Sequence, residues 1–192
     1  MTAATPRSIA LVRHGETDWN INRRLQGRTD IPLNETGQAQ ARAAAELLRE
    51  YRPDWATVVS SPLGRAVETS QIIGSALGLA EPSIDEALIE RHFGEAEGLL
   101  VADAQTRWPE LNVPGAESTA EVAIRSAKAF ARLLATAPDA VVVAHGAMLR
   151  LGLTELCQTE IPRVLNAEVW LLTESTDGPP IARSLGLAHP AV

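Results

Sequence analysis

The sequence is poor in several residue types, and each shortage excludes a class of protein. Its 192 residues include one cysteine, Cys157, so neither an intramolecular disulfide nor a cysteine-rich metal site can form. Lysine is as scarce, because Lys128 is the only one and all other basic residues are arginines. No apolar stretch approaches the roughly 20 residues of a membrane span, and the amino-terminal segment lacks the apolar core of a signal peptide. We therefore expect a cytoplasmic protein without a membrane partner.

Negative charge is in excess, which excludes another class of partner. The formal net charge is -7 at pH 7, so a broad surface for nucleic acid is not expected. Any anion site must be a local basic pocket on an acidic body. The preference for arginine fits such a pocket, although it can equally reflect genomic base composition. Hydrophobic residues make up 45% of the chain, enough for the core of one domain over residues 1–192.

Apolar segments alternate with helical patterns along the chain. The segments predicted as strands are 8–12, 55–60, 141–144, 169–173 and 181–185. The segments predicted as helices are 37–50, 61–77, 118–136 and 147–156, with Ser61 and Ser118 as amino-terminal caps. This alternation predicts an α/β fold, a three-layer α/β/α sandwich with a mostly parallel central sheet. Residues 100–118 show weaker periodicity, and residues 91–118 are expected to form a small insertion, or cap, over the carboxyl ends of the strands.

Polar clusters follow three of the predicted strands: Arg13-His14-Gly15, residues 60–65, and His145-Gly146. In open α/β sheets, ligands bind outside the carboxyl ends of the strands, so these clusters should meet at one site. Arg65 falls in the first turn of its helix, where free backbone N–H groups already favour an anion. Guanidinium groups match phosphoryl oxygens two at a time, which makes phosphate the expected ligand.

The two strand-end histidines suggest covalent phosphoryl transfer. One imidazole nitrogen could attack phosphorus while a backbone carbonyl holds the other nitrogen, and the second imidazole could stabilise the transferring oxygens. A metal site is the alternative. The sequence has neither paired histidines at helical spacing nor clustered carboxylates, and its histidines are far apart at positions 14, 92, 145 and 189. We expect catalysis without a metal or other cofactor.

Six blocks of sequence, in order, add a resemblance to these patterns: 13–17 with Trp19-Asn20, 33–41, 60–69, 90–98, 114–118 and 143–146. Together they resemble the histidine phosphatase superfamily, also called the phosphoglycerate mutase-like family, over nearly the whole chain. The resemblance implies that His14 is the nucleophile that becomes phosphohistidine. It also implies that Glu90 is the general acid, which protonates the leaving oxygen and later activates water.

The resemblance implies further site residues. The catalytic residues would be His14, Glu90, Arg13, Arg65 and His145. The phosphate- and substrate-binding residues would be Arg13, Asn20, Arg65, His145, Gly146, Gln26 and Arg91. Among these, Arg91 would contact a substrate carboxylate. Gln26 is included because residues 23–26 follow the nucleophile closely and could reach the substrate, although Arg23 and Arg24 could equally be a solvated pair.

The blocks divide between two branches of the family. Residues 90–94 resemble the mutase form, whereas 114–118 resemble the phosphatase form, and the stretch after Gly98 lacks the paired arginines and proline run of mutases. The cationic cover over the site is expected to be thin, with little to hold a bisphosphorylated cofactor. We therefore expect a metal-independent phosphomonoesterase acting on a small phosphorylated metabolite through a phosphohistidine intermediate.

Two other functions stay open. The first alternative is a 2,3-bisphosphoglycerate-dependent phosphoglycerate mutase. The second is a non-catalytic phospho-ligand-binding module, which the general acid Glu90 argues against because a binder has no use for it. The oligomeric state is also open, since Leu165, Val169 and Leu171 fit either the core or the edge of a homodimer.

Overall fold

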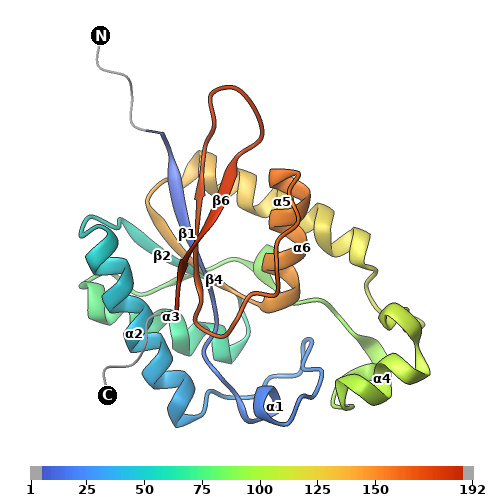
Figure 1. Cartoon of the computed structure of the whole chain (residues 1–192). Helices are drawn as coiled ribbons and strands as arrows, with labels where there is room; N and C mark the ends of the chain where they lie inside the picture. Colours follow the sequence, from blue (N-terminus) through green and yellow to red (C-terminus); the bar gives the residue numbers. More distant parts are fainter. Residues whose placement is uncertain (1–5, 188–192) are drawn as a thin grey trace.

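A six-stranded sheet forms the centre of the molecule (Figure 1). The computed structural model describes residues 6–187. The strand order is β3–β2–β4–β1–β5–β6, with the bounds Ser8–Arg13 (β1), Thr57–Ser60 (β2), Ser83–Ile84 (β3), Ala140–Ala144 (β4), Val169–Thr173 (β5) and Ile181–Gly186 (β6). β1 to β4 run parallel, whereas β5 is antiparallel to β1 and β6 is antiparallel to β5. The prediction of a mostly parallel sheet is confirmed, and the two-residue β3 is an addition to it.

Helices cover both faces of this sheet. α2 (Glu35–Tyr51) and α3 (Gly64–Leu77) pack on one face, and α5 (Thr119–Thr136) and α6 (Gly146–Cys157) pack on the other (Figure 1). Side chains of β1 alternate between the two faces, as a strand requires. Ala10 and Val12 join the cluster under α2 and α3, whereas Ile9 and Leu11 join the cluster under α5 and α6. The three-layer sandwich is confirmed.

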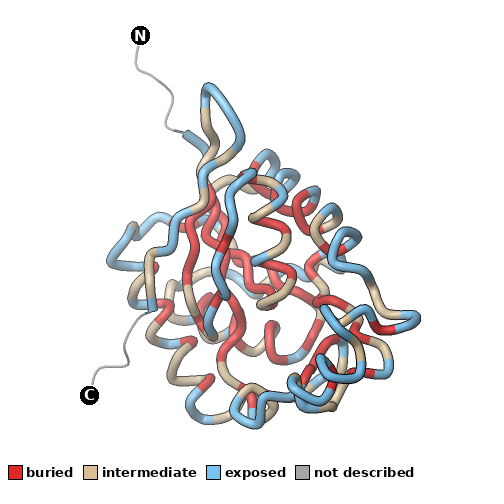
Figure 2. The backbone as a smooth tube through the Cα atoms, turned by 45° about the vertical axis from the view of Figure 1, so that its right-hand side comes forward, coloured by how far each residue is buried: buried red, intermediate tan, exposed pale blue. Residues whose placement is uncertain are grey.

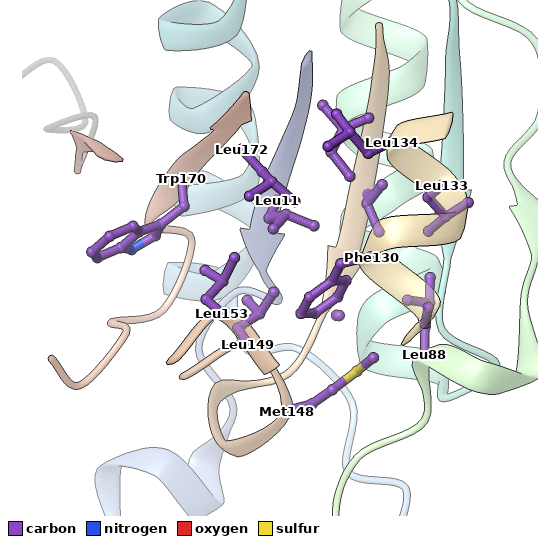
Figure 3. Close-up of a cluster of buried hydrophobic side chains, with 14 of the residues drawn as sticks. Leu11, Leu88, Phe130, Leu133, Leu134, Met148, Leu149, Leu153, Trp170 and Leu172 are labelled. Atoms are coloured by element: carbon purple, nitrogen blue, oxygen red, sulfur yellow. The ribbon is translucent and has the colours of Figure 1, made fainter. Parts of the chain in front are cut away.

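The core is continuous across the central strands. Every residue of β1 and β4 is buried, which Figure 2 shows as red segments in the middle of the molecule. In Figure 3, Leu11 meets Phe130 from α5 and Leu149 from α6, and all three side chains are inaccessible to solvent. Strands covered on both faces are expected to read as unbroken apolar runs. This burial explains why the sequence revealed them so clearly.

The structure confirms one of the two predicted helix caps and contradicts the other. Ser118 caps α5 as predicted, and its side chain accepts from the backbone N–H of Glu121 while the Glu121 carboxylate accepts from the Ser118 N–H. The prediction that Ser61 caps the next helix was wrong, because α3 begins at Gly64 and its N-cap residue is Leu63. The Ser61 hydroxyl lies instead 2.6 Å from Nε2 of His145, so it belongs to the site.

The segment expected as a cap has more regular structure than its sequence suggested. Residues 94–111 contain α4 (Val101–Arg107) and two short 3-10 turns, and α1 (Asp18–Ile21) is a further short helix that the sequence did not reveal. This segment packs on its own small apolar cluster, which consists of Leu25, Phe93, Ala96, Ala104 and Val113. In Figure 1, α1 and α4 lie at the lower end of the molecule, where β1 ends.

Two remaining expectations concern surfaces. Val169 and Leu171 are buried in the core, so neither is available to a dimer edge, whereas Leu165 is exposed. No helix within residues 6–187 combines the length and the apolar character needed to cross a bilayer.

Candidate active site

A cavity of about 970 Å³ opens beyond the carboxyl ends of β1 and β4. Most of the predicted site residues line it: Arg13, His14, Asn20, Gln26, Arg65, Glu90 and Gly146. His145 lies fully buried beside His14, with the two ring centroids 5.2 Å apart. The topology therefore brings together polar groups from the ends of two neighbouring parallel strands, as the strand-end rule predicts.

The His14 ring is held in one tautomer by its two neighbours. Its Nδ1 lies 2.7 Å from the Gly15 carbonyl, which can only accept a hydrogen bond, so Nδ1 carries the proton. Nε of Arg65 donates to Nε2 of His14 over 3.3 Å, so Nε2 carries a lone pair. Burial, together with the charges of Arg65 and Arg13, holds the pKa of His14 well below the ordinary 6.5. The imidazole is thus neutral and nucleophilic at Nε2.

The peptide that fixes this tautomer is itself clamped. The Gly15 N–H donates to the Thr69 hydroxyl over 3.1 Å, and Nδ2 of Asn166 donates to the carbonyls of His14 and Gly15 over 3.1 and 3.2 Å. A side chain at position 15 would not fit, because a Cβ there would lie 2.3 Å from the carbonyl oxygen of Gly37. Neither Thr69 nor Asn166 was anticipated from the sequence as part of this site.

Two buried arginines flank His14. Arg65 donates to the carbonyls of Gly27 and Thr29 over 2.7 and 2.8 Å, which aims its remaining Nε at His14. Arg13 donates to the Val164 carbonyl over 2.9 Å, and its buried Nε has no hydrogen-bond partner among the described residues. Burial lowers the pKa of Arg13 to about 10 and also lowers the pKa of Arg65, yet both groups remain cationic at neutral pH.

His145 is oriented from behind by Ser61. The Ser61 hydroxyl oxygen accepts from the Leu63 N–H over 3.4 Å and lies 2.6 Å from Nε2 of His145, so its proton can be donated to that nitrogen. The proton of the neutral ring then resides on Nδ1, which is buried and has no partner within residues 6–187. Burial, with the charge of Arg65, holds the pKa of His145 well below the ordinary 6.5. Nδ1–H is therefore a buried donor without an acceptor among the described residues, close to the ring of His14.

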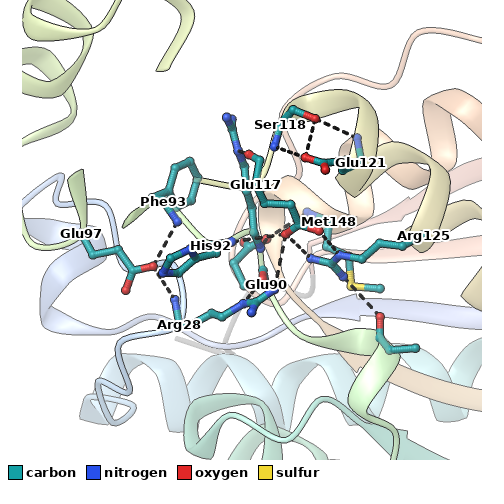
Figure 4. Close-up of polar contacts among 12 residues, drawn as sticks. Arg28, Glu90, His92, Phe93, Glu97, Glu117, Ser118, Glu121, Arg125 and Met148 are labelled. Carbon is teal, nitrogen blue, oxygen red and sulfur yellow. Dashed lines mark hydrogen bonds and ion pairs between the residues drawn. The ribbon is translucent and has the colours of Figure 1, made fainter. Parts of the chain in front are cut away.

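Glu90 sits at the amino end of α6. Its carboxylate accepts three backbone N–H bonds, from Arg91 at 2.8 Å, Met148 at 3.1 Å and Ala147 at 3.2 Å. Figure 4 shows the side chain directed at Met148. Because helix N–H groups have no partner inside the helix, a carboxylate placed there is both satisfied and fixed in position.

The chain around Glu90 is anchored by two more carboxylates (Figure 4). Glu97 accepts from the N–H of Phe93 and Arg28, each at 3.1 Å, and Glu117 pairs with the Arg125 guanidinium. Burial opposes ionisation of Glu97, but the hydrogen bonds from Thr29 and the neighbouring amides outweigh it and lower the pKa. These contacts tie residues 90–98 to the loop after the nucleophile and to α5.

Two predicted site residues, Arg91 and His145, do not line the cavity, and the side chain of Arg91 is engaged elsewhere. Its Nε donates to the Glu117 carbonyl over 2.8 Å, and its terminal nitrogen donates to the Leu111 carbonyl over 3.0 Å. The guanidinium also lies over the Phe93 ring, 4.9 Å from its centroid. These contacts hold the side chain inside the cap, so the structure does not bring Arg91 to the cavity, and its contact with a substrate carboxylate stays a prediction.

Two arginines in the cavity wall were missed by the sequence analysis. Arg150 lies on α6, four residues after Gly146, and such spacing places two residues on the same helix face. This periodicity was a usable signal. Arg163 lies in the loop before β5, where no pattern in the sequence indicates the direction of a side chain. With Arg23 and Arg24 also in the wall, the expectation of a thin cationic cover was wrong.

The two neutral imidazoles predict how stability depends on pH. Because their pKa values are lowered in the folded chain, the unfolded chain binds more protons, so the free energy of unfolding falls as pH drops below about 6.5. Each such group contributes a slope of up to about 1.4 kcal/mol per pH unit. We therefore expect the free energy of unfolding, measured by urea denaturation between pH 7.5 and 5, to depend less steeply on pH in His145→Gln than in the wild type. The difference should correspond to the uptake of about one proton on unfolding. Equal slopes would contradict the neutral, buried state of this ring.

The family model of the histidine phosphatase superfamily (branch 1) matches residues 9–180. The chain belongs to the histidine phosphatase superfamily. Its relatives in this superfamily include both phosphatases and mutases. An uncharacterized phosphatase PhoE of Bacillus subtilis is 37% identical over 166 residues, covering 83% of this chain and 84% of the relative. A 2,3-bisphosphoglycerate-dependent phosphoglycerate mutase 2 of Gloeobacter violaceus is 34% identical over 178 residues, covering 84% and 80%.

Solved structures agree with this membership. A mycobacterial glucosyl-3-phosphoglycerate phosphatase, solved with VO3, superposes on this histidine phosphatase with a TM-score of 0.77. The two chains are 30% identical, and the match covers 95% of this chain and 98% of the other. The chain is therefore an enzyme of a family that contains phosphatases and phosphoglycerate mutase-like proteins.

Proposed function

We propose that this protein is a metal-independent phosphomonoesterase that acts on a small phosphorylated metabolite and forms a phosphohistidine at Nε2 of His14. The observation that carries the proposal is the fixed tautomer of His14. Nδ1 donates to the Gly15 carbonyl and Nε2 accepts from Arg65, so the lone pair belongs to the nitrogen beside the cationic group. The nitrogen that would attack phosphorus therefore lies beside the guanidinium that would neutralise the charge of the phosphoryl group.

In the first step, Nε2 attacks phosphorus and the bond from phosphorus to the ester oxygen breaks. Arg13, Arg65 and Nδ1–H of His145 supply donors to the three transferring oxygens. Asn20 can add a further donor, because its Oδ1 already accepts from Thr17 and Asn166 and its Nδ2 remains for the ligand. Such pre-placed donors stabilise charge where it develops in phosphoryl transfer.

Glu90 would move the proton in both steps. Protonated Glu90 gives its proton to the departing ester oxygen, and the resulting carboxylate then takes a proton from water as the water attacks phosphohistidine. The bond from nitrogen to phosphorus breaks in that second step, which returns neutral His14 and inorganic phosphate. The backbone donors around Glu90 support this role, since they hold its carboxylate at the cavity wall.

Gly146 supports the position of Arg13 in this scheme. A Cβ at residue 146 would lie 3.1 Å from Nε of Arg13, so a side chain there would press on the guanidinium that grips phosphate. Glycine also leaves the first N–H of α6 accessible to an anion.

The test is turnover of p-nitrophenyl phosphate together with trapping of the phosphoenzyme. The enzyme is expected to hydrolyse this ester equally with and without EDTA, because its arginines supply the positive charge. Rapid quenching with labelled substrate should yield protein-bound phosphate that is stable in alkali and labile in acid. A strong loss in EDTA that a divalent metal restores would overturn the metal-independent mechanism.

A mutase is the second candidate function, and the arginines in the cavity wall favour it. Arg23, Arg24, Arg150 and Arg163 add positive charge around the phosphoryl site, which could hold a bisphosphorylated compound. Incubation of 3-phosphoglycerate with and without 2,3-bisphosphoglycerate separates the two functions. A phosphatase releases inorganic phosphate in both samples, whereas a mutase forms 2-phosphoglycerate only with the bisphosphate. The cytoplasmic location stays a prediction, and the oligomeric state, for which a homodimer is one possibility, stays open.

A further inference from the structure

The cavity holds more positive charge than one phosphate group requires. Six arginines line it, against a single carboxylate, Glu90, among the described residues: Arg13, Arg23, Arg24, Arg65, Arg150 and Arg163. The chain as a whole carries a formal charge of -7, so this concentration of cations is local. Arg13 and Arg65 suffice to balance the charge of a phosphate dianion, so the other four arginines exceed what that group requires.

Arg150 and Arg163 come from segments that both touch Arg13. Gly146, one turn before Arg150 on α6, lies so close that a Cβ there would be 3.1 Å from Nε of Arg13. Val164, the neighbour of Arg163, accepts a hydrogen bond from Arg13 through its carbonyl at 2.9 Å. The two segments therefore flank the phosphate-gripping guanidinium, and both side chains reach the same cavity wall.

Neither of these arginines is neutralised by the protein. Within residues 6–187, neither Arg150 nor Arg163 forms an ion pair or donates a side-chain hydrogen bond, and both are exposed at the cavity. Arg163 is close enough that its charge contributes to lowering the pKa of Arg13, after the larger effect of burial. Two like charges placed beside a third destabilise the free protein, and an anion that binds them relieves this cost.

The other two arginines differ in their partners or their position. Arg24 donates to the Gly98 carbonyl over 2.6 Å and its backbone bridges to Leu100, so it ties the nucleophile loop to the cap. Arg23 lies on the same loop, beside apolar wall residues from α1 and α4 such as Ile21 and Val101. The side of the cavity nearest Arg13 thus offers two free guanidinium groups, one from a helix and one from an anchored loop, whereas the loop after His14 offers one, that of Arg23.

We propose that Arg150 and Arg163 form a second anion subsite, so that the substrate is a phosphomonoester with another negative group on the same carbon skeleton. This inference rests on the proposed function and specifies its substrate class. Arg91 does not serve this purpose, because carbonyls of the cap occupy its guanidinium. A cavity of about 970 Å³ has room for a ligand larger than phosphate. The second group is a carboxylate or a second phosphate, both of which bind guanidinium through paired oxygens.

Matched substrates test the subsite. 3-Phosphoglycerate and glycerol 3-phosphate share a phosphate on a three-carbon skeleton and differ by one carboxylate, and fructose 1,6-bisphosphate and fructose 6-phosphate differ by one phosphate. In at least one pair, kcat/KM should be about tenfold or more higher for the more anionic member. Arg150→Gln and Arg163→Gln should each reduce that ratio severalfold, mainly through KM, and Arg→Lys at the same position should restore part of it. The pair that responds identifies the second group.

A charge-matched control separates the subsite from net charge. Arg42 is exposed on α2, outside the cavity wall, and makes no ion pair with a described residue, so Arg42→Gln should leave both ratios unchanged. Binding of each ligand to the His14→Ala enzyme, measured by calorimetry, gives the same comparison without turnover. If the kcat/KM ratio is near one in both substrate pairs and the variants do not change it, the subsite is refuted. Hydrolysis of p-nitrophenyl phosphate and formation of phosphohistidine would still support the proposed function in that case. Absence of the phosphoenzyme would instead refute the proposed function, and the calorimetric comparison would still decide the subsite.

Discussion

His14→Ala is expected to abolish both turnover and phosphoenzyme formation, with a loss in kcat of roughly 10⁴-fold or more. The substitution removes the nitrogen that would bond to phosphorus, and no other group lies in its place. We do not expect His145 to substitute, because its Nε2 is engaged with Ser61 and the residue does not line the cavity. Steady-state hydrolysis of p-nitrophenyl phosphate and acid-labile labelling of the protein measure the two effects separately.

A second histidine provides the control for this variant. His92 lies outside the cavity wall, where its backbone N–H and carbonyl bond to Glu117, so His92→Ala should retain turnover and labelling. The circular dichroism spectrum of His14→Ala should match that of the wild type, because the strand that precedes residue 14 is fixed by sheet hydrogen bonds on both sides. Near-normal hydrolysis by the folded His14→Ala enzyme would refute the assignment of the nucleophile.

Glu90→Gln is expected to reduce kcat/KM by about 10²–10⁴-fold for alkyl phosphates, the range for loss of a general acid. The fall should be much smaller for p-nitrophenyl phosphate, because nitrophenolate leaves without needing a proton. Dephosphorylation also slows without the base, so the labelled phosphoenzyme should accumulate to a higher level. Kinetics across a series of esters of increasing leaving-group pKa measure the effect directly.

The result that contradicts proton transfer is an equal loss on every ester. Such a loss would mean that Glu90 acts only by holding the amino end of α6, where an amide can accept fewer of the three backbone N–H bonds than a carboxylate does. Glu95→Gln is the matched control. This residue lies in the same segment, is exposed and is absent from the cavity wall, so its substitution should affect neither kind of ester.

The sequence predicts most accurately the strands that are buried on both faces of the sheet, because such strands are apolar along their whole length. β1 and β4 are apolar throughout because helices cover both sheet faces, and the polar residues that follow them had to meet at one edge. The two residues of β3 are both exposed, so they carry no hydrophobic pattern from which a strand could be inferred. α4 buries one residue, Ala104, and its seven residues are too few to show a helical stripe.

Side-chain direction in the loops could not be predicted, because distant backbone determines it. Arg91 points into the cap because carbonyls at positions 111 and 117 satisfy its guanidinium, and neither partner is visible in the residues around it. The local pattern around Ser61 predicts a helix cap, whereas a histidine far along the chain bonds to its hydroxyl. Arg150 is the exception among the missed residues, since its spacing from Gly146 along the helix already indicated that both face the site.

The strand order has a consequence for the synthesis of the protein. β1 emerges first from the ribosome, yet both of its partners, β4 and β5, begin at Ala140 and Val169. The contact of Arg13 with Val164, and the contacts of the His14 loop with Asn166, likewise join an early residue to one that is made much later. The apolar first strand must therefore stay unpaired until residues far along the chain have been made, and the loop that follows it lacks its contacts with Val164 and Asn166 until then. The site is therefore completed only after β4 and β5 have been made, and until then the first strand presents unpaired edges of the kind that favour aggregation.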